Sequence, residues 1–189
     1  RYSLFVAPRG GMTDLMQALT VQIMSADVRL RAAVRSVAPH DAQSWMIETD
    51  DGQRETYAAT ILALPSYRAA ALLSGDTTQG LAAKLNEIDY ASSAVVCCGY
   101  RLSQIGQKLN AFGCVVPRTT DRRVLAVSYS SLKFPDRAPP GRVLLRIFVG
   151  GALRPELAEL GDAPLRHLVR EAVEAILSVR GEPEICHIV

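Results

Sequence analysis

The residues that most often carry acid–base or metal chemistry are few in this chain and lie far apart. The three histidines are His40, His167 and His187, and none has a carboxylate or cysteine at the spacing of a catalytic pair or a metal site. The sequence contains no G-x-G-x-x-G, P-loop, H-E-x-x-H or G-x-S-x-G motif. It therefore predicts no catalytic side chain and no metal site. It favours a protein that binds and orients a cofactor, which itself carries the reacting atoms.

Cysteine usage gives no sign of a metal clamp or a disulfide framework. The four cysteines are Cys97, Cys98, Cys114 and Cys186, and none belongs to a C-x-x-C pair. The adjacent Cys97 and Cys98 have poor geometry for one metal ion or for a normal disulfide. Cysteine is among the most frequently buried residue types, so we expect reduced, buried thiols in a cytoplasmic protein. The opening residues RYSLFVAPRGG lack the layout of a secretory signal.

Composition indicates a globular chain with a sizeable core. A length of 189 residues, 49% of them hydrophobic, allows one medium domain or two small lobes. A net charge of +2 gives no electrostatic basis for a nucleic-acid partner. No apolar run reaches the roughly 18 residues that a membrane-spanning helix needs.

The centre of the chain, 111–151, predicts a sheet that buries something apolar. Turn-forming polar and proline-rich segments separate three β-rich runs. The residues before this stretch, 90–100, are small or apolar almost throughout, which is typical of a strand covered on both faces. Asp50-Asp51-Gly52 is a hairpin signal. Helices are expected over 13–24, 65–73, 80–88, 155–160 and 165–177, and strands over 28–30, 34–37, 45–49, 57–64, 90–100, 112–117, 124–129, 143–149 and from 184 onward.

These elements predict a mixed α+β fold. A largely antiparallel sheet covered by helices should form the main body, and the strands before residue 64 should form a small β-meander. The final helix carries its apolar residues at helical spacing and its arginines and glutamates on the other side, which indicates one buried face.

Several short motifs stand in one order along the central stretch: FGCVVP at 112–117, KFPDRAPPG at 133–141 and the pair Gly150-Gly151. Together they resemble the substrate domain of the FAD-dependent protoporphyrinogen/coproporphyrinogen oxidases, members of the flavin amine-oxidase superfamily. The resemblance extends from Phe5 to about Pro183. It implies a flavoenzyme of haem biosynthesis that oxidises a porphyrinogen to the porphyrin with FAD and oxygen. The segment 28–66 resembles the meander and returning strand of the FAD domain, although Ala58-Ala59-Thr60 lacks the acidic residue usual there.

The resemblance implies a division into a partial FAD-binding domain at 1–66 and a substrate-binding domain at 67–189. The family's pyrophosphate-binding βαβ unit, its helical lobe and its C-terminal segment have no counterpart in these residues. We therefore expect a fragment that alone neither holds FAD tightly nor turns over. Its parent is expected in the cytoplasm, with peripheral contact to the inner face of the membrane through the helical lobe.

The resemblance also assigns site residues. Those for the substrate are Phe112, which packs on a pyrrole ring, Gly113, where a side chain would collide with the macrocycle, and Val115, Phe148 and Cys98 as further walls. Those for the cofactor are Val34, Ala63, Leu64 and Pro65. The residue types alone favour a plainer interpretation, in which the two phenylalanines are core residues and Val34 and Ala63 belong to the sheet. Three arginines beside the 112–117 strand could reach a substrate carboxylate, but a solvated loop is the preferred interpretation: Arg118, Arg122 and Arg123.

Two further expectations concern the ligand and the partners, and two alternatives concern the function. The ligand is a flat tetrapyrrole, and exposed apolar surface or strand edges could support a homodimer. One alternative keeps the superfamily but changes the substrate to an amine or a polyene. Another is a non-catalytic domain that binds a tetrapyrrole or a protein through an apolar face.

Overall fold

The computed structural model describes residues 4–117, 119–120 and 123–189. Two compact units emerge. One comprises Leu19–Tyr90, and the other combines Ala91–Val189 with the described part of Arg1–Ala18. These units follow contacts within the chain, whereas the division into cofactor and substrate domains is one of function and stays a prediction. Helix α1 (Met12–Gln22) forms as expected, with its apolar side chains exposed. No helix in the described ranges is long and apolar enough to cross a membrane.

The Leu19–Tyr90 unit contains the predicted meander. Strands β1 (Val34–Asp41), β2 (Ser44–Thr49) and β3 (Arg54–Tyr57) are antiparallel in the order β1-β2-β3. The hairpin at Asp50–Gly52 is confirmed, because Gly52 has a φ of +83° and its N–H donates to the carbonyl of Thr49. Helices α2 (Ser66–Leu72) and α3 (Gln79–Asn86) follow, with the 3-10 turn η1 (Asp76–Thr78) between them.

Two expected strands of this unit are not formed. The segment 28–30 is irregular, and the strand expected over 57–64 stops at Tyr57. Beyond Tyr57, no described strand pairs with the chain before α2, and Ile61 is 91% exposed. Local β propensity was insufficient there, because a strand is stabilised by a neighbouring strand that accepts its backbone hydrogen bonds.

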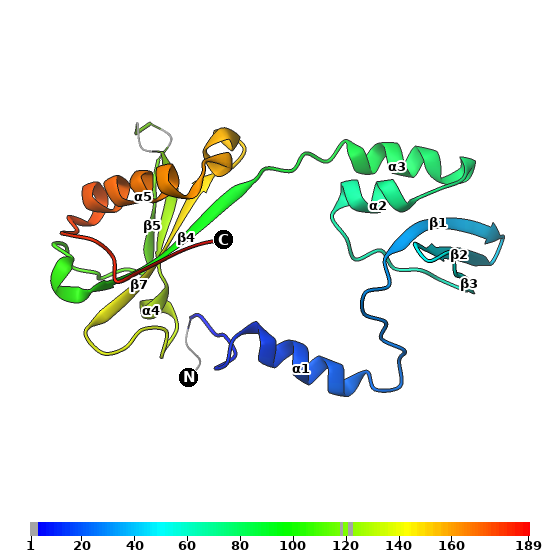
Figure 1. Cartoon of the computed structure of the whole chain (residues 1–189), viewed down its shortest axis with the longest axis horizontal. Coiled ribbons are helices and arrows are strands. Elements are labelled where there is room, and N and C mark those ends of the chain that lie inside the picture. Colours follow the sequence, from blue (N-terminus) through cyan, green and yellow to red (C-terminus); the bar gives the residue numbers. More distant parts are fainter. Residues whose placement is uncertain (1–3, 118, 121–122) are drawn as a thin grey trace. The chain divides into compact units, whose positions relative to one another are not determined.

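The second unit is built on a five-stranded antiparallel sheet in the order β5-β6-β7-β4-β8. Helix α5 lies along one face of this sheet (Figure 1). Its apolar stripe is confirmed: Leu165, Leu168, Val169 and Val173 are each at most 3% exposed. The elements are β4 (Ser93–Arg101), η2 (Leu102–Gln104), β5 (Gly113–Val115), β6 (Val124–Tyr129), α4 (Ser130–Lys133), β7 (Arg142–Gly150), η3 (Pro155–Glu159), α5 (Asp162–Leu177) and β8 (Ile185–Ile188).

Alternation along β7 separates the two faces of the sheet. Val143, Leu145, Ile147 and Val149 are at most 1% exposed and belong to the core beneath α5. The residues between them point to the opposite face, because successive side chains of a strand alternate. This opposite face, called the open face below, carries Leu144, Arg146 and Phe148 from β7. The expected α+β fold is therefore confirmed, with a helix-covered antiparallel sheet and a separate small meander.

Candidate functional site

The register of the sheet gathers two of the predicted substrate residues into one row on the open face. Val115 of β5 pairs with Ala126 of β6, and Ala126 pairs with Phe148 of β7. Phe148 is in turn opposite Val95 of β4. Val115 and Phe148 are 33 residues apart in the sequence numbering and lie on strands that do not touch, yet they share one face through the strand between them.

The next row on the same face is more polar. Gly113 pairs with Ser128, Ser128 with Arg146, and Arg146 with Cys97. A third predicted residue, Gly113, therefore lies beside the Val115–Phe148 row. The row also introduces Arg146, a cation that sequence reasoning did not single out.

Aromatic side chains form one wall of a hollow at this face. The ring of Phe112 meets that of Phe5 edge to face, with centroids 5.0 Å apart, and Phe5 meets Phe134 in the same way at 6.2 Å. Phe112 remains 44% exposed, so its ring is not part of the core. The hollow has a volume of about 500 Å3, within the range of small-molecule sites. It is lined by Phe5, Phe112, Gly113, Cys114, Val115, Ala126, Val127, Ser128, Ser130, Lys133, Phe134, Arg146 and Phe148.

Gly113 has a structural reason of its own to be glycine. A Cβ atom built at this position would lie 2.4 Å from the carbonyl oxygen of Val127 and 3.0 Å from the Cα of Ser128. The backbone φ of +150° also disfavours a side chain. Close packing of β5 on β6 therefore requires the glycine, and the predicted collision with a macrocycle remains a separate prediction.

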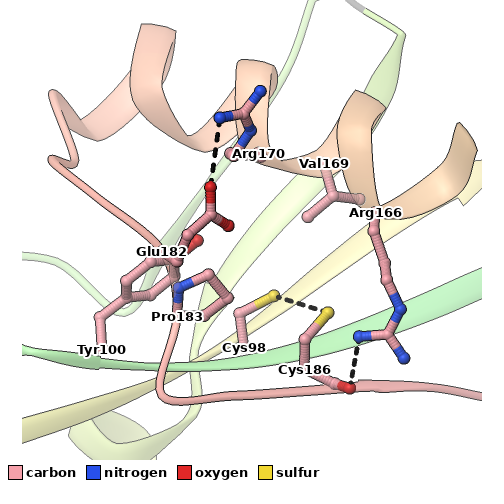
Figure 2. A pocket seen from close by; sticks show the side chains of 8 residues that line it. All are labelled: Cys98, Tyr100, Arg166, Val169, Arg170, Glu182, Pro183 and Cys186. Carbon is pink, nitrogen blue, oxygen red and sulfur yellow. Dashed lines mark hydrogen bonds and ion pairs between the residues drawn. The ribbon is translucent and has the colours of Figure 1, made fainter. Parts of the chain in front are cut away.

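Cys98 is not brought together with the other predicted substrate residues. It pairs with Leu145 and is 1% exposed in the core beneath α5, whereas Cys97 pairs with Arg146 on the open face. Cys98 lines a different, smaller cavity of about 290 Å3. Figure 2 shows it there next to Cys186 of β8. The sequence could not show whether Cys97 or Cys98 points to the open face, because the residues on both faces of this strand are apolar.

The charged side chains around this smaller cavity already have partners. An N–H of Arg166 donates to the carbonyl of Cys186 at 2.8 Å, and Arg170 pairs with Glu182 at 3.2 Å (Figure 2). Burial, followed by the neighbouring Cys186, raises the pKa of the Cys98 thiol. Cys98 is therefore protonated at neutral pH and packs as a small apolar side chain.

The predicted cofactor residues all lie in the Leu19–Tyr90 unit but do not converge on one hollow. Val34 begins β1 opposite Thr49, and both line a depression of about 570 Å3 on the meander. Ala63, Leu64 and Pro65 do not line it, since they form the exposed, irregular segment that leads into α2.

The site contains residues that sequence reasoning missed. Lys133 and Arg146 supply its positive charge, and Phe5 and Phe134 extend its aromatic wall. The sequence does contain a pattern that places Arg146 on the face of Phe148. The two residues are two positions apart on the expected strand, and residues at that spacing share a face. No local signal connects Phe5 to Phe112. Of the three arginines beside β5, Arg123 is paired with Glu171 at 3.4 Å, while Arg118 and Arg122 lie outside the described residues.

Comparison with known proteins agrees with these motifs. The chain is 25% identical to coproporphyrinogen III oxidase of Bacillus subtilis (strain 168) over 175 residues, which cover 93% of this chain and 36% of that protein. It is 31% identical to the chloroplastic protoporphyrinogen oxidase of Oryza sativa subsp. japonica over 196 residues, with 93% and 36% covered. The chain thus spans little more than a third of the length of these relatives.

A solved structure shares the fold. A provisionally assigned protoporphyrinogen oxidase from Exiguobacterium sp. 255-15 superposes with a TM-score of 0.77 at 23% identity, covering 95% of this chain and 38% of that one. Residues 2–189 match the family model described as flavin containing amine oxidoreductase. Together with the motifs of the open face, this match confirms the resemblance, and the chain belongs to the family of flavin-containing amine oxidoreductases.

Proposed function

We propose that this chain contributes the substrate-binding face of a flavin-dependent oxidase that converts a porphyrinogen to the porphyrin. The observation that carries the proposal is the convergence of Phe112, Gly113, Val115 and Phe148 on one open face around a hollow of about 500 Å3. Three of these residues belong to the FGCVVP motif at 112–117, and Phe148 stands two residues before the Gly150-Gly151 pair, so both lie at motifs that mark the resemblance to porphyrinogen oxidases.

The hollow suits a flat, largely apolar ring system. The exposed ring of Phe112 offers an aromatic surface for stacking, while Val115 and Phe148 offer apolar contacts in a neighbouring row. Gly113 and Ala126 leave space for a ligand between these residues, because neither has a side chain larger than a methyl group. The role of these residues is to bind and orient the macrocycle and to exclude water from it.

Part of a flavin site fits the residues present. When bound, a flavin would supply the acceptor for the substrate's hydride equivalents. The exposed segment Ala63–Pro65 would hold one edge of it through backbone groups, with Val34 serving the nucleotide. The hydroxyl of the neighbouring Thr60 is buried without a hydrogen-bond partner in the described chain, as expected for a group that meets a ligand. The sequence has no G-x-G-x-x-G to hold the pyrophosphate, so we expect these residues alone to bind flavin weakly and not to turn over.

A porphyrin titration tests the proposal. Coproporphyrin III, a stable oxidised product, would be titrated with the chain while its absorbance and fluorescence anisotropy are followed. We expect saturable binding that weakens about tenfold in Phe112→Ala, which removes the stacking ring. The matched control is Leu132→Ala, since Leu132 is 41% exposed but does not line the hollow. Absence of saturable binding to the unmodified chain, or equal binding by Phe112→Ala, would contradict the proposal.

A further inference from the structure

Two cations face the hollow of the open face from different elements. Lys133 is the last residue of α4, and Arg146 lies in the middle of β7. The Nζ of Lys133 lies 5.1 Å from the centre of the Phe5 ring, and the Cζ of Arg146 lies 5.4 Å from the centre of the Phe148 ring. The two charges therefore stand at the aromatic walls rather than away from them.

Their charge is not neutralised within the described chain. Arg101 and Arg142 share Glu184, and Arg170 pairs with Glu182. Lys133 and Arg146 instead have no carboxylate partner among the described residues, and no aspartate or glutamate lines the hollow. Contact with an aromatic face leaves the N–H donors of both groups available, because a cation–π interaction engages the charge and not the hydrogen-bond geometry.

This arrangement is selective for the charge of a ligand. An amine would bring a third positive charge into a hollow without a compensating acid, so the hollow disfavours it. A carboxylate gains two parallel hydrogen bonds from the guanidinium fork of Arg146 and a point charge from Lys133. Arg146 and Phe148 stand two residues apart on one strand face, about 7 Å along the strand, so a ring that lies against Phe148 can present a carboxylate on a short arm to Arg146.

Resting on the proposed function, we propose that Lys133 and Arg146 bind carboxylates at the rim of the porphyrinogen and so determine substrate choice. They favour a tetracarboxylic porphyrinogen, of the coproporphyrinogen type, over a dicarboxylic one of the protoporphyrinogen type. A ring with four carboxylates can present them to both cations in more orientations than a ring in which vinyl groups replace two of the four.

The test compares three stable porphyrins on the same chain: coproporphyrin III, its uncharged tetramethyl ester and protoporphyrin IX, all dispersed in one non-ionic detergent. The variants are Lys133→Gln and Arg146→Gln. Lys108→Gln is the control, because Lys108 is exposed and outside the hollow, and the change removes the same charge. We expect coproporphyrin III to bind best and to lose about tenfold in affinity in each variant, with the ester unchanged and the control unaffected. Added salt should weaken the binding of coproporphyrin III and protoporphyrin IX, which carry carboxylates, but not that of the ester.

The outcomes separate this inference from the function on which it rests. If acid and ester bind equally and both weaken in Phe112→Ala, the porphyrin site stands and the carboxylate inference is overturned. If Lys133→Gln and Arg146→Gln also weaken binding of the tetramethyl ester, the two side chains shape the hollow and do not bind carboxylates, and the inference fails. If no porphyrin binds the unmodified chain, both proposals fail. Arg146→Lys, which keeps the charge but not the fork, should retain part of the preference for coproporphyrin III.

Discussion

The Sγ atoms of Cys98 and Cys186 lie 3.8 Å apart, at directly opposed positions of β4 and β8. Val95 and Val189 exchange both backbone hydrogen bonds, so the alternation of an antiparallel ladder makes Cys98 and Cys186 a non-hydrogen-bonded pair. Side chains at such pairs stand closest together across the two strands. The thiols are thus adjacent although 88 positions separate them in the chain.

Mild oxidation should join these two cysteines before any other pair. Two thiols and one molecule of diamide give a disulfide and the reduced hydrazine, so the reaction balances without another reagent. Cys186 is less buried than Cys98, and the pKa of Cys98 is raised by burial, so Cys186 should meet the reagent first. Mass spectrometry of non-reduced peptides should find the Cys98–Cys186 link in the unmodified chain and in Cys97→Ser. Its absence from both would contradict the geometry.

Replacing Gly113 with alanine should destabilise the five-stranded sheet. The new Cβ would lie 2.4 Å from the carbonyl oxygen of Val127, so β5 must move away from β6. We expect the free energy of unfolding to fall by about 1–3 kcal/mol, measured by urea denaturation. Gly80→Ala is the control, because this α3 glycine has open space around it and alanine is the better helix former. Equal effects of the two substitutions would refute the packing explanation.

Protonation of Glu184 should lower the free energy of unfolding as the pH falls in the acidic range. Hydrogen bonds from Arg101, and then from Arg142, lower the pKa of this carboxyl below its ordinary value. Because the folded-state pKa is the lower one, the stabilisation is fully present above the unfolded pKa of about 4.3 and is lost as pH falls through the folded value. Unfolding curves of the unmodified chain and Glu184→Gln should differ slightly at pH 7 and converge as the pH falls through the lowered folded-state pKa. A difference that is constant with pH would show that the ion pairs are not its source.

The core beneath α5 should be far more sensitive than the open face of the same strand. Leu145 is 0% exposed, and Leu144 next to it is half-buried on the other face. Leu145→Ala should lower the free energy of unfolding by about 2–5 kcal/mol, since it leaves a cavity that the close-packed core cannot fill. Leu144→Ala should cost less than half as much, as judged by denaturant midpoints at constant m-value. The reverse order would mean that the faces have been assigned the wrong way round.

Sequence by itself determined the features of this protein that depend on neighbours in the chain. The apolar stripe of α5, the Asp50–Gly52 hairpin and the strands around Phe112 and Phe148 follow from spacings of a few residues, which local steric and hydrophobic preferences can specify. The motifs around Phe112 and Gly150 likewise identified the family before any contact was known. The strand expected beyond Tyr57 failed because its stability depends on a partner strand and not on its own composition.

Only the tertiary structure decided which side chains meet. Cross-strand register places Val115 in line with Phe148, and it puts Cys97 rather than Cys98 on their face. Because a shift of one residue would reverse every side chain, alternation within an all-apolar strand cannot specify this choice. Strand spacing could place Arg146 on the face of Phe148, but only the packing of α4 against β7 brings Lys133 to the same hollow.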